Sequence, residues 1–392
     1  MTTSHLMTSY SPLPVRFTKG RGVWLEDDQG DQYLDALSGI AVCGLGHVHP
    51  DIAAAISDQA CTLVHTSNVY QIDLQEKLAD RLCALSSMEK VFFGNSGAEA
   101  NEAAIKLARL HGRNKDIDVP TIVVMEGSFH GRTMATLSAT GNPNVRANFQ
   151  PLVESFVHIP YGDIDALTSL AKENKNIVAV LCEPVQGEGG VNIPADGFLS
   201  KIRELCDQND WLMMLDEIQT GMGRTGKWFA FQHEKIIPDV MTLAKALGNG
   251  VPIGACLAKG KAASLFTPGT HGSTFGGNPL ACRAGIAVID VLQANNLVDQ
   301  AQKRGQYLLT QFQKSLSELQ EVVDIRGKGL MIGIELDRPC VELVKQALDQ
   351  KLLINVTAGN TIRLLPPLII CEAECDQIVD ILTPLIRSFL KQ

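Results

Sequence analysis

Short apolar runs that alternate with helical stretches constrain the fold of this chain more than any other feature. The runs cover residues 91–93, 121–125, 177–182, 212–215, 240–243 and 253–258, and each is apolar on both faces. Helices are expected at residues 99–111 and 198–209, and from 279 to about 293. Strands without a polar face, separated by helices, are typical of a mostly parallel sheet buried between helices. The sequence therefore predicts an α/β domain.

The pattern changes after residue 279, and the remaining chain is expected to form a smaller α+β domain. One helical stretch continues to about residue 319. Strands are then expected at 322–326, 330–336, 354–356 and 362–365, with helices at 341–351 and from about 372. Strand-like pieces at 23–25 and 32–34 place the beginning of the chain in the same domain. We therefore expect residues 1–48 and 286–392 to form a small domain and residues 49–285 to form a large one. Two domains agree with the usual size of ~150 residues per domain.

Charge and cysteine usage exclude several classes of protein. Lys and Arg number 34 against 43 Asp and Glu, and the net charge of −9 gives no support for binding nucleic acid or an anionic membrane. The ten cysteines are scattered, which favours a reducing compartment over a disulfide framework. No segment has the apolar length of a signal peptide or a membrane span. We expect a cytoplasmic protein.

Two motifs are discounted. Residues 221–226 fit the glycine pattern of dinucleotide-binding proteins, in which the glycines directly follow a strand and open a helix. Here residues 216–219 intervene, and Trp228 and Phe229 follow where a helix should run, so no dinucleotide site is expected. His47 and His49 suggest a metal, but no third ligand of matching spacing stands out. We expect a histidine-containing turn and no metal site.

Two residues that end predicted strands suit pyridoxal phosphate. This cofactor needs a lysine for a Schiff base and an acid against its pyridine nitrogen. Lys245 is embedded in an apolar run, where desolvation lowers the pKa of an amine and makes it nucleophilic. Asp216 follows the run 211–215, and a carboxylate there either caps a helix or keeps the pyridine nitrogen protonated. Both lie where open α/β sheets bind ligands.

Two further segments suit the phosphate and the ring of the same cofactor. Residues 94–101 follow a strand and open a helix, whose N-terminal amides attract an anion. Ser96 with Glu99 also fits an ordinary capping box. Phe129 is placed to stack on a ring or to pack in the core. Arg132 is suited to bind a substrate carboxylate through two parallel bonds, or it lies at the surface.

Six motifs, in one order, resemble the class III, ω-type aminotransferases, a family of fold-type I pyridoxal-phosphate enzymes. The motifs are residues 95–101, 129–133, 183–188 (Glu-Pro-Val-Gln-Gly-Glu), 216–221 (Asp-Glu-Ile-Gln-Thr-Gly), 242–248 (Thr-Leu-Ala-Lys-Ala-Leu-Gly) and 271–279. The similarity extends from about residue 25 to the C-terminus and, within the family, is greatest to acetylornithine aminotransferases. It implies an α/β fold in which a mainly parallel seven-stranded sheet forms the large domain and both chain ends build the small α+β domain.

The resemblance also assigns roles to individual residues. Toward the cofactor, it implies that Gly97 and Ala98 offer amides to the phosphate, which Thr274 also contacts. It implies that Phe129 and Ile218 cover the two ring faces, while Asp216 pairs with the ring nitrogen and Gln219 lies near the ring hydroxyl. It implies that Lys245 carries the cofactor and shuttles the proton. Toward the substrate, it implies contacts from Arg132, Ser273, Arg363 and Glu188. The family often has Thr where this chain has Ala98, so a backbone contact is retained and a hydroxyl contribution is lost.

The implied reaction is reversible transamination between N2-acetylornithine and 2-oxoglutarate, a step of arginine biosynthesis, in a homodimer with shared active sites. Succinyl-diaminopimelate, a lysine precursor, is a second candidate donor. One alternative is another ω-aminotransferase that acts on ornithine, succinylornithine or 4-aminobutyrate. A more remote alternative is a catalytically inactive binding protein on the same fold, against which the joint presence of Lys245, Asp216 and Arg363 argues. Fold alone does not fix function.

Overall fold

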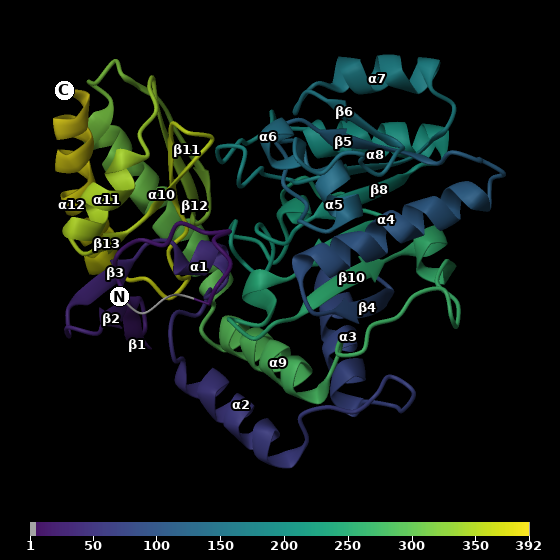
Figure 1. Ribbon diagram of the computed structural model, residues 1–392, viewed down its shortest axis with the longest axis horizontal. Helices are drawn as coiled ribbons and strands as arrows, with labels where there is room; N and C mark the ends of the chain where they lie inside the picture. The colour runs from purple at the N-terminus through teal and green to yellow at the C-terminus, as the bar shows by residue number, and fades with distance from the viewer. Residues whose placement is uncertain (1–4, 392) are drawn as a thin grey trace.

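A seven-stranded sheet forms the centre of the larger part of the molecule, counted over residues 5–391, which the computed structural model describes. Its strand order is β4 (Lys90–Gly94), β10 (Gly254–Ala258), β9 (Val240–Leu243), β8 (Leu212–Asp216), β7 (Ile177–Cys182), β5 (Thr121–Met125) and β6 (Phe156–Ile159). Only β10 runs antiparallel to its neighbours; the other pairs in this sheet are parallel. Figure 1 shows the sheet among its helices on the right of the molecule.

The central strands are apolar on both faces because helices cover both faces of the sheet. Every residue of β5, β7, β8, β9 and β10 is buried. Successive side chains point to opposite faces of a strand. On β5, Val123 belongs to the same core as Ile202 of α8 (Phe198–Asn209), whereas Ile122 and Val124 pack in the core of α4 (Gly97–Arg113). The sheet is therefore a buried layer between helices, as the apolar runs predict.

Two smaller sheets form the other part of the molecule. One contains β11 (Val322–Lys328), β12 (Met331–Leu336), β15 (Thr361–Leu364) and β14 (Asn355–Thr357), all antiparallel. The other joins β1 (Phe17–Arg21), β2 (Trp24–Asp27) and β3 (Gln32–Asp35) to β13 (Leu352–Leu353). β13 is parallel to β3, with Leu352 opposite Leu34, so segments from both halves of the chain share one sheet. In Figure 1 these purple and yellow elements lie together on the left.

Further helices cover the sheets and connect the two parts. They are α1 (Ser38–Ala41), α2 (Pro50–Thr62), α3 (Asp73–Ser86), α5 (Met134–Ala139), α6 (Pro143–Arg146), α7 (Ile164–Glu173), α9 (Pro279–Ala294), α10 (Leu297–Leu316), α11 (Glu342–Asp349) and α12 (Glu372–Leu390). Within residues 5–391, no helix has both the length and the apolar character that crossing a membrane requires.

The expected strands and helices are confirmed, with one error. The single helical stretch expected from 279 to about 319 is wrong, because α9 ends at Ala294 and α10 begins at Leu297. Asn296, between them, has a φ of 49°. Asparagine tolerates this left-handed conformation, and a continuous helix does not accommodate it. The boundary expected between residues 285 and 286 falls inside α9, and the division into domains stays a prediction.

Candidate active site

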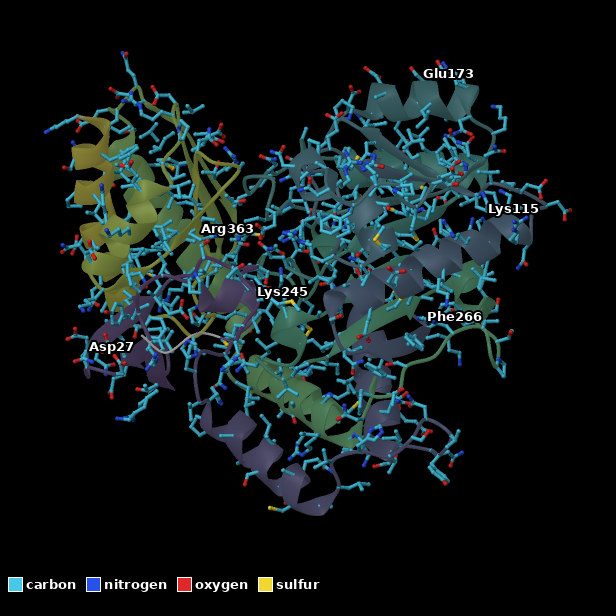
Figure 2. All side chains as sticks on the ribbon, in the orientation of Figure 1. Asp27, Lys115, Glu173, Lys245, Phe266 and Arg363 are labelled. Carbon is cyan, nitrogen blue, oxygen red and sulfur yellow. The ribbon has the colours of Figure 1, made fainter. Side chains whose placement is uncertain are left out.

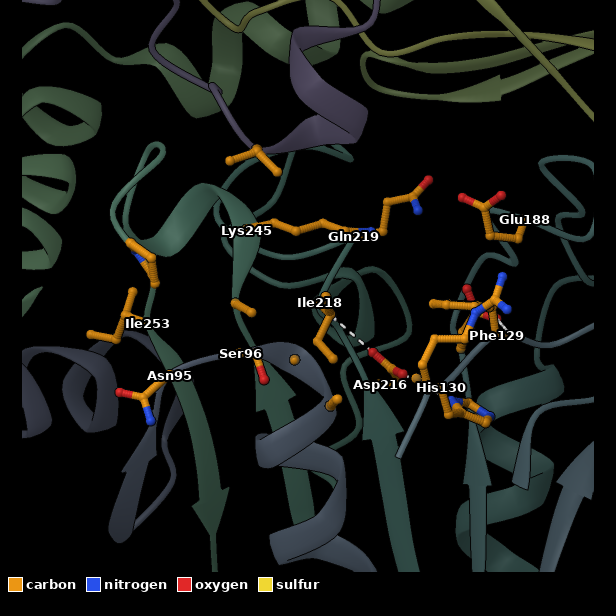
Figure 3. Close-up of a pocket in the computed structure, with 18 of the residues that line it drawn as sticks. Asn95, Ser96, Phe129, His130, Glu188, Asp216, Ile218, Gln219, Lys245 and Ile253 are labelled. Atoms are coloured by element: carbon orange, nitrogen blue, oxygen red, sulfur yellow. Dashed lines mark hydrogen bonds and ion pairs between the residues drawn. The ribbon is translucent and has the colours of Figure 1, made fainter. Parts of the chain in front are cut away.

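The carboxyl ends of neighbouring strands meet at a cavity of about 390 Å³. β7, β8 and β9 end beside it, and the segments that follow β4 and β5 complete its wall. In Figure 3, labelled side chains from these segments surround one space. The expected site residues that line the cavity are Gly97, Ala98, Phe129, Arg132, Glu188, Asp216, Ile218, Gln219 and Lys245.

Asp216 is buried at the end of β8 and fixed by several donors. Its Oδ2 accepts from Nδ2 of Asn101 at 2.8 Å, and Nδ1 of His130 lies 2.8 Å from the same oxygen. Its Oδ1 accepts from the amide of Ile218 at 3.1 Å, a contact drawn in Figure 3. Thr242 Oγ1 donates to Oδ1 of Asn101 at 2.7 Å, which turns the amide nitrogen of Asn101 toward Asp216. The carboxylate is therefore held in one orientation at the cavity wall.

Lys245 is separated from β9 by one residue, Ala244, and opens a short 3-10 turn, Lys245–Leu247. Its φ of 45° lies in the left-handed region, which is uncommon outside glycine and clusters at functional sites. Desolvation by the surrounding protein lowers the pKa of its amine below the ordinary value. Glu188 opposes this shift and Arg363 adds to it. A lowered pKa leaves more of the amine in the neutral, nucleophilic form.

The N-terminus of α4 forms the part of the wall that suits an anion. Ser96 caps this helix by accepting from the amide of Glu99 at 3.2 Å. The amides of Gly97 and Ala98, in the first turn, have no acceptor within the helix. A Cβ at Gly97 would lie 2.7 Å from Cδ1 of Ile218, so a larger residue here would displace the side chain of Ile218. Small residues and free amides at a helix start are the features of a phosphate site.

An ion pair between a buried arginine and a partly exposed glutamate lies at the cavity, where the two parts of the molecule meet. Arg363 on β15 is fully buried and does not itself line the cavity. One terminal nitrogen, Nη1, lies 2.7 Å from Oε1 of Glu188 and donates to Oε1 of Gln219 at 3.3 Å. Its Nε donates to Oδ1 of Asn355 at 3.1 Å, while Nη2 has no partner among residues 5–391. Figure 2 shows Lys245 and Arg363 at this junction.

Ser273 and Thr274 lie apart from Lys245. They line a second cavity, of about 660 Å³, which shares Asn95 with the first. Oγ of Ser273 accepts from Nδ2 of Asn95 at 3.3 Å and from the amide of Gly276 at 3.0 Å. Thr274 is exposed. Within one chain, therefore, neither residue reaches the cavity that contains Lys245.

The structure adds three residues that the sequence did not single out. Asn101 and His130 hold Asp216, and the buried Glu183 accepts from the amides of Phe129 and Gly187. All three lie inside the motifs 95–101, 129–133 and 183–188. The signal was therefore present in the sequence, but Asp216 and Phe129, which these side chains contact, lie in distant segments of the chain.

The two discounted motifs have structural roles. In residues 221–226, Nη1 of the buried Arg224 donates to the carbonyl oxygens of Leu330 at 2.9 Å and Pro366 at 2.5 Å, which ties this turn to the smaller part of the molecule. Nε2 of His47 lies 2.8 Å from Oδ2 of Asp35. Residues 5–391 contain no cluster of His, Cys, Asp and Glu that suits a metal ion.

Comparison with known proteins finds one matching family and several similar aminotransferases. The profile of the family described as "Aminotransferase class-III" matches residues 6–386. Acetylornithine aminotransferase of Nitrosomonas europaea is 59% identical over 388 residues, which cover 99% of each chain. The crystal structure of ornithine aminotransferase from Toxoplasma gondii has a TM-score of 0.95 at 33% identity, covering 99% of this chain and 93% of that one. Acetylornithine aminotransferase from Elizabethkingia anophelis has a TM-score of 0.88 at 36% identity, covering 98% and 96%.

Proposed function

The chain belongs to the class III aminotransferase family, and from this premise we propose that it is an acetylornithine aminotransferase of arginine biosynthesis. It has the α/β fold of the fold-type I pyridoxal-phosphate enzymes. The proposed reaction moves the terminal amino group of N2-acetylornithine to 2-oxoglutarate and yields N-acetylglutamate 5-semialdehyde and glutamate. The observation that carries this function is one cavity that joins the amine of Lys245, the buried carboxylate of Asp216 and the start of α4.

The residues around the cavity fit pyridoxal phosphate. The amides of Gly97 and Ala98 would hold its phosphate, and Phe129 and Ile218 would enclose its ring. Gln219 would lie near the ring hydroxyl. When bound, the cofactor supplies an aldehyde that exchanges amino groups and a ring that accepts the electron pair released at the substrate carbon. The match is supported by the chemistry of these groups: free helix amides for an anion, an apolar slot for a ring and a neutral amine for an aldehyde.

Lys245 and Asp216 would have different catalytic roles. Nζ of Lys245, whose pKa is lowered by desolvation, would remove a proton from the carbon that carries the substrate amine. Asp216 would keep a positive charge on the ring nitrogen, since its carboxylate is buried and oriented by Asn101 and His130. A buried negative charge is stabilised by such a partner, and removal of either one destabilises the other.

The ion pair between Glu188 and Arg363 would let one site accept two different donors. Glutamate carries a carboxylate beside the amine that reacts, whereas N2-acetylornithine has methylenes there. A buried arginine left unpaired beside methylenes costs about 3–5 kcal/mol. We infer that Glu188 neutralises Arg363 while N2-acetylornithine is bound and swings away when glutamate enters. Arg132 would bind the far carboxylate of N2-acetylornithine.

Ser273 and Thr274 would act in a homodimer. Thr274 would reach the phosphate bound by the other subunit, and Ser273 would contact the substrate. The exposure of Thr274 and the open backbone at Gly272, where no atom lies within 4 Å of an added Cβ, support a close approach by a second chain. Two half-sites would then complete each other across a two-fold axis.

Single-turnover half-reactions test the proposed substrate. The purified holoenzyme is mixed in turn with N2-acetylornithine, succinyl-diaminopimelate, ornithine, succinylornithine, 4-aminobutyrate and glutamate, and the cofactor absorbance is followed. The proposal expects the highest kcat/KM among the ω-amino donors for N2-acetylornithine. Faster reaction of ornithine or 4-aminobutyrate would identify another ω-aminotransferase. Absence of any absorbance change would support a binding protein.

A further inference from the structure

Glu183 has a carboxylate whose two oxygens hold two different walls of the cavity. It follows β7 directly and is buried, and it lines the cavity. Its Oε1 accepts from the amide of Phe129 at 3.0 Å. Its Oε2 accepts from the amide of Gly187, also at 3.0 Å. One side chain therefore joins the segment after β5 to the turn that carries Glu188.

Both of these walls face the space where substrate and cofactor would bind. Phe129 lines the cavity, and the guanidinium carbon of Arg132 lies 5.6 Å from the centre of its ring. Gly187 lies tightly against Gln219, since a Cβ at Gly187 would be 2.4 Å from the side chain of Gln219. The next residue, Glu188, pairs with Arg363. Movement of the Gly187 backbone would therefore change both Gln219 and the ion pair.

The chemistry of the contact requires a carboxylate. The two N–H groups approach different oxygens of Glu183, and a carboxylate offers both oxygens as acceptors. A glutamine supplies one oxygen and turns its NH₂ group toward the other amide, where two donors face each other. An aspartate keeps both acceptors but is one methylene shorter, so it cannot reach both amides from the same backbone position.

We propose that Glu183 is the positioning residue that fixes the Phe129 wall and the Glu188 turn relative to each other, and so sets the discrimination between the two amino donors. This inference rests on the proposed function, in which Glu188 leaves Arg363 when glutamate enters. With the amide of Gly187 anchored, only the side chain of Glu188 moves in that exchange. Without the anchor, the amide of Gly187 is released while Thr357 still holds the carbonyl oxygen of Glu188. The turn then tilts and Glu188 covers Arg363 less well, which disfavours N2-acetylornithine.

Glu217 provides a matched control. It is also a buried glutamate, and it accepts from the amides of Ala230 at 2.8 Å and Phe231 at 2.9 Å. It does not line the cavity. Glu183→Gln and Glu217→Gln therefore make the same chemical change at equal burial, and only the first loosens the two cavity walls.

Hydrogen exchange of the backbone amides measures the anchoring directly, in the holoenzyme and after removal of the cofactor. Glu183→Gln should speed exchange at Phe129 and Gly187 by about tenfold or more, the effect of losing a well-formed hydrogen bond. Glu217→Gln should do so at Ala230 and Phe231 instead. Wild-type exchange at Phe129 and Gly187 in Glu183→Gln would overturn the proposal. If this variant does not fold, Glu183→Asp gives the same test.

Half-reaction rates measure the consequence for catalysis. Glu183→Gln should lower the ratio of the N2-acetylornithine rate to the glutamate rate by about tenfold, within the range of coupling between residues in contact. Glu217→Gln should leave this ratio unchanged. Because Glu183 acts through the Glu188 turn, Glu183→Gln combined with Glu188→Ala should give the ratio of Glu188→Ala alone. A ratio unaffected by Glu183→Gln, or effects that multiply in the double variant, would contradict the proposed coupling.

Failure of the proposed role of Glu183 can be distinguished from failure of the proposed function. If the wild type does not use N2-acetylornithine, the substrate proposal fails in the wild type itself. The role of Glu183 is then tested with whichever ω-amino donor reacts, and amide exchange is measured in either case.

Discussion

Oε1 of Glu188 lies 2.7 Å from Nη1 of Arg363, and this ion pair separates the cavity from a fully buried guanidinium. The two partners differ in environment. The side chain of Arg363 is 0% exposed, whereas that of Glu188 is 37% exposed and so has room to move. Arg363 also bonds Asn355 and Gln219, which would keep it in place in the proposed departure of Glu188. The acid is therefore the partner that we propose to move.

Glu188→Ala should slow the N2-acetylornithine half-reaction by about 10- to 100-fold and spare the glutamate half-reaction, because an uncovered Arg363 disfavours methylenes and accepts a carboxylate. Arg363→Ala should have the opposite effect and weaken glutamate most. Stopped-flow absorbance of each half-reaction measures both. Glu335→Ala is the control, because it breaks a different ion pair, between Glu335 on β12 and Arg326 on β11. Equal losses for both donors would leave only a structural pair.

Lys245→Ala should abolish turnover while the protein still binds pyridoxal phosphate through the start of α4. The reason is that the phosphate site and the amine belong to different segments of the wall. Borohydride treatment of the wild type, followed by peptide mapping, should find the pyridoxyl group on Lys245. Lys201→Ala, which removes an exposed lysine of α8, should retain wild-type activity. A label on another lysine would rule out this role for Lys245.

Asp216→Asn should reduce both half-reactions by about 100- to 1000-fold, the loss typical of removing one preorganised electrostatic group. The substitution keeps the size of the side chain and removes its charge. Unlike variants of Glu188 or Arg363, it should affect both donors equally, because the proposed charge on the ring nitrogen serves both. Half-reaction rates and the absorbance of the bound cofactor check this. A selective loss with one donor would argue against the assignment.

Mixed dimers test the proposed sharing of sites. Lys245→Ala and Thr274→Ala chains should each be inactive or nearly so as homodimers. After subunit exchange, a heterodimer should regain one intact site, formed by Lys245 of one chain and Thr274 of the other. Activity should approach half the wild-type value per heterodimer. If mass spectrometry demonstrates subunit exchange but activity does not increase, Thr274 does not contribute to the active site of the other chain.

His47 should make folding stability depend on pH. Its hydrogen bond to Asp35 and a further contact with Cys43 raise the pKa of His47 from its ordinary value of 6.5 to about 9. The protonated form is therefore favoured in the folded state. This contribution, at most about 3 kcal/mol because solvent screens the half-buried side chain, is fully present below pH 6.5 and is lost as the pH rises through about 9.

Thermal midpoints of wild type and His47→Gln, measured from pH 6 to pH 10, check the sign of this effect. The wild type should be the more stable protein at pH 6, and the difference should disappear above about pH 9. A difference that stays constant with pH would mean that His47 stabilises the fold without carrying a charge.

The sequence predicted the buried strands well because burial on both faces leaves an uninterrupted apolar run, as in residues 177–182. β6 (Phe156–Ile159) was not predicted, since it lies at the edge of the sheet, is only partly buried at three of its four residues and includes His158. The break between α9 and α10 was also missed. It depends on the backbone conformation of Asn296 and leaves the apolar periodicity intact.

The candidate site was predictable where a residue's function depends on its place at a strand end. Asp216 is the last residue of β8, Lys245 lies two residues after the end of β9, and both line the cavity. The resemblance to the family did indicate the pairing of Glu188 with Arg363, but the side chains that orient other site residues, such as His130 and Glu183, were not predicted. His130 and Asp216 are 86 positions apart, and Phe129 and Glu183 are 54 apart. Such pairs depend on the order of strands in the sheet, which local sequence patterns do not specify.

The parallel pairing of β3 with β13 has a consequence for how the chain folds during synthesis. Leu34 pairs with Leu352, which is synthesised much later, so the small sheet that contains both cannot be completed until nearly all of the chain has left the ribosome. The strands of the central sheet lie between residues 90 and 258 and are complete much earlier. We expect the central sheet to fold first and the buried apolar residues of β3, Tyr33 and Leu34, to stay uncovered until then, which exposes this segment to aggregation during synthesis.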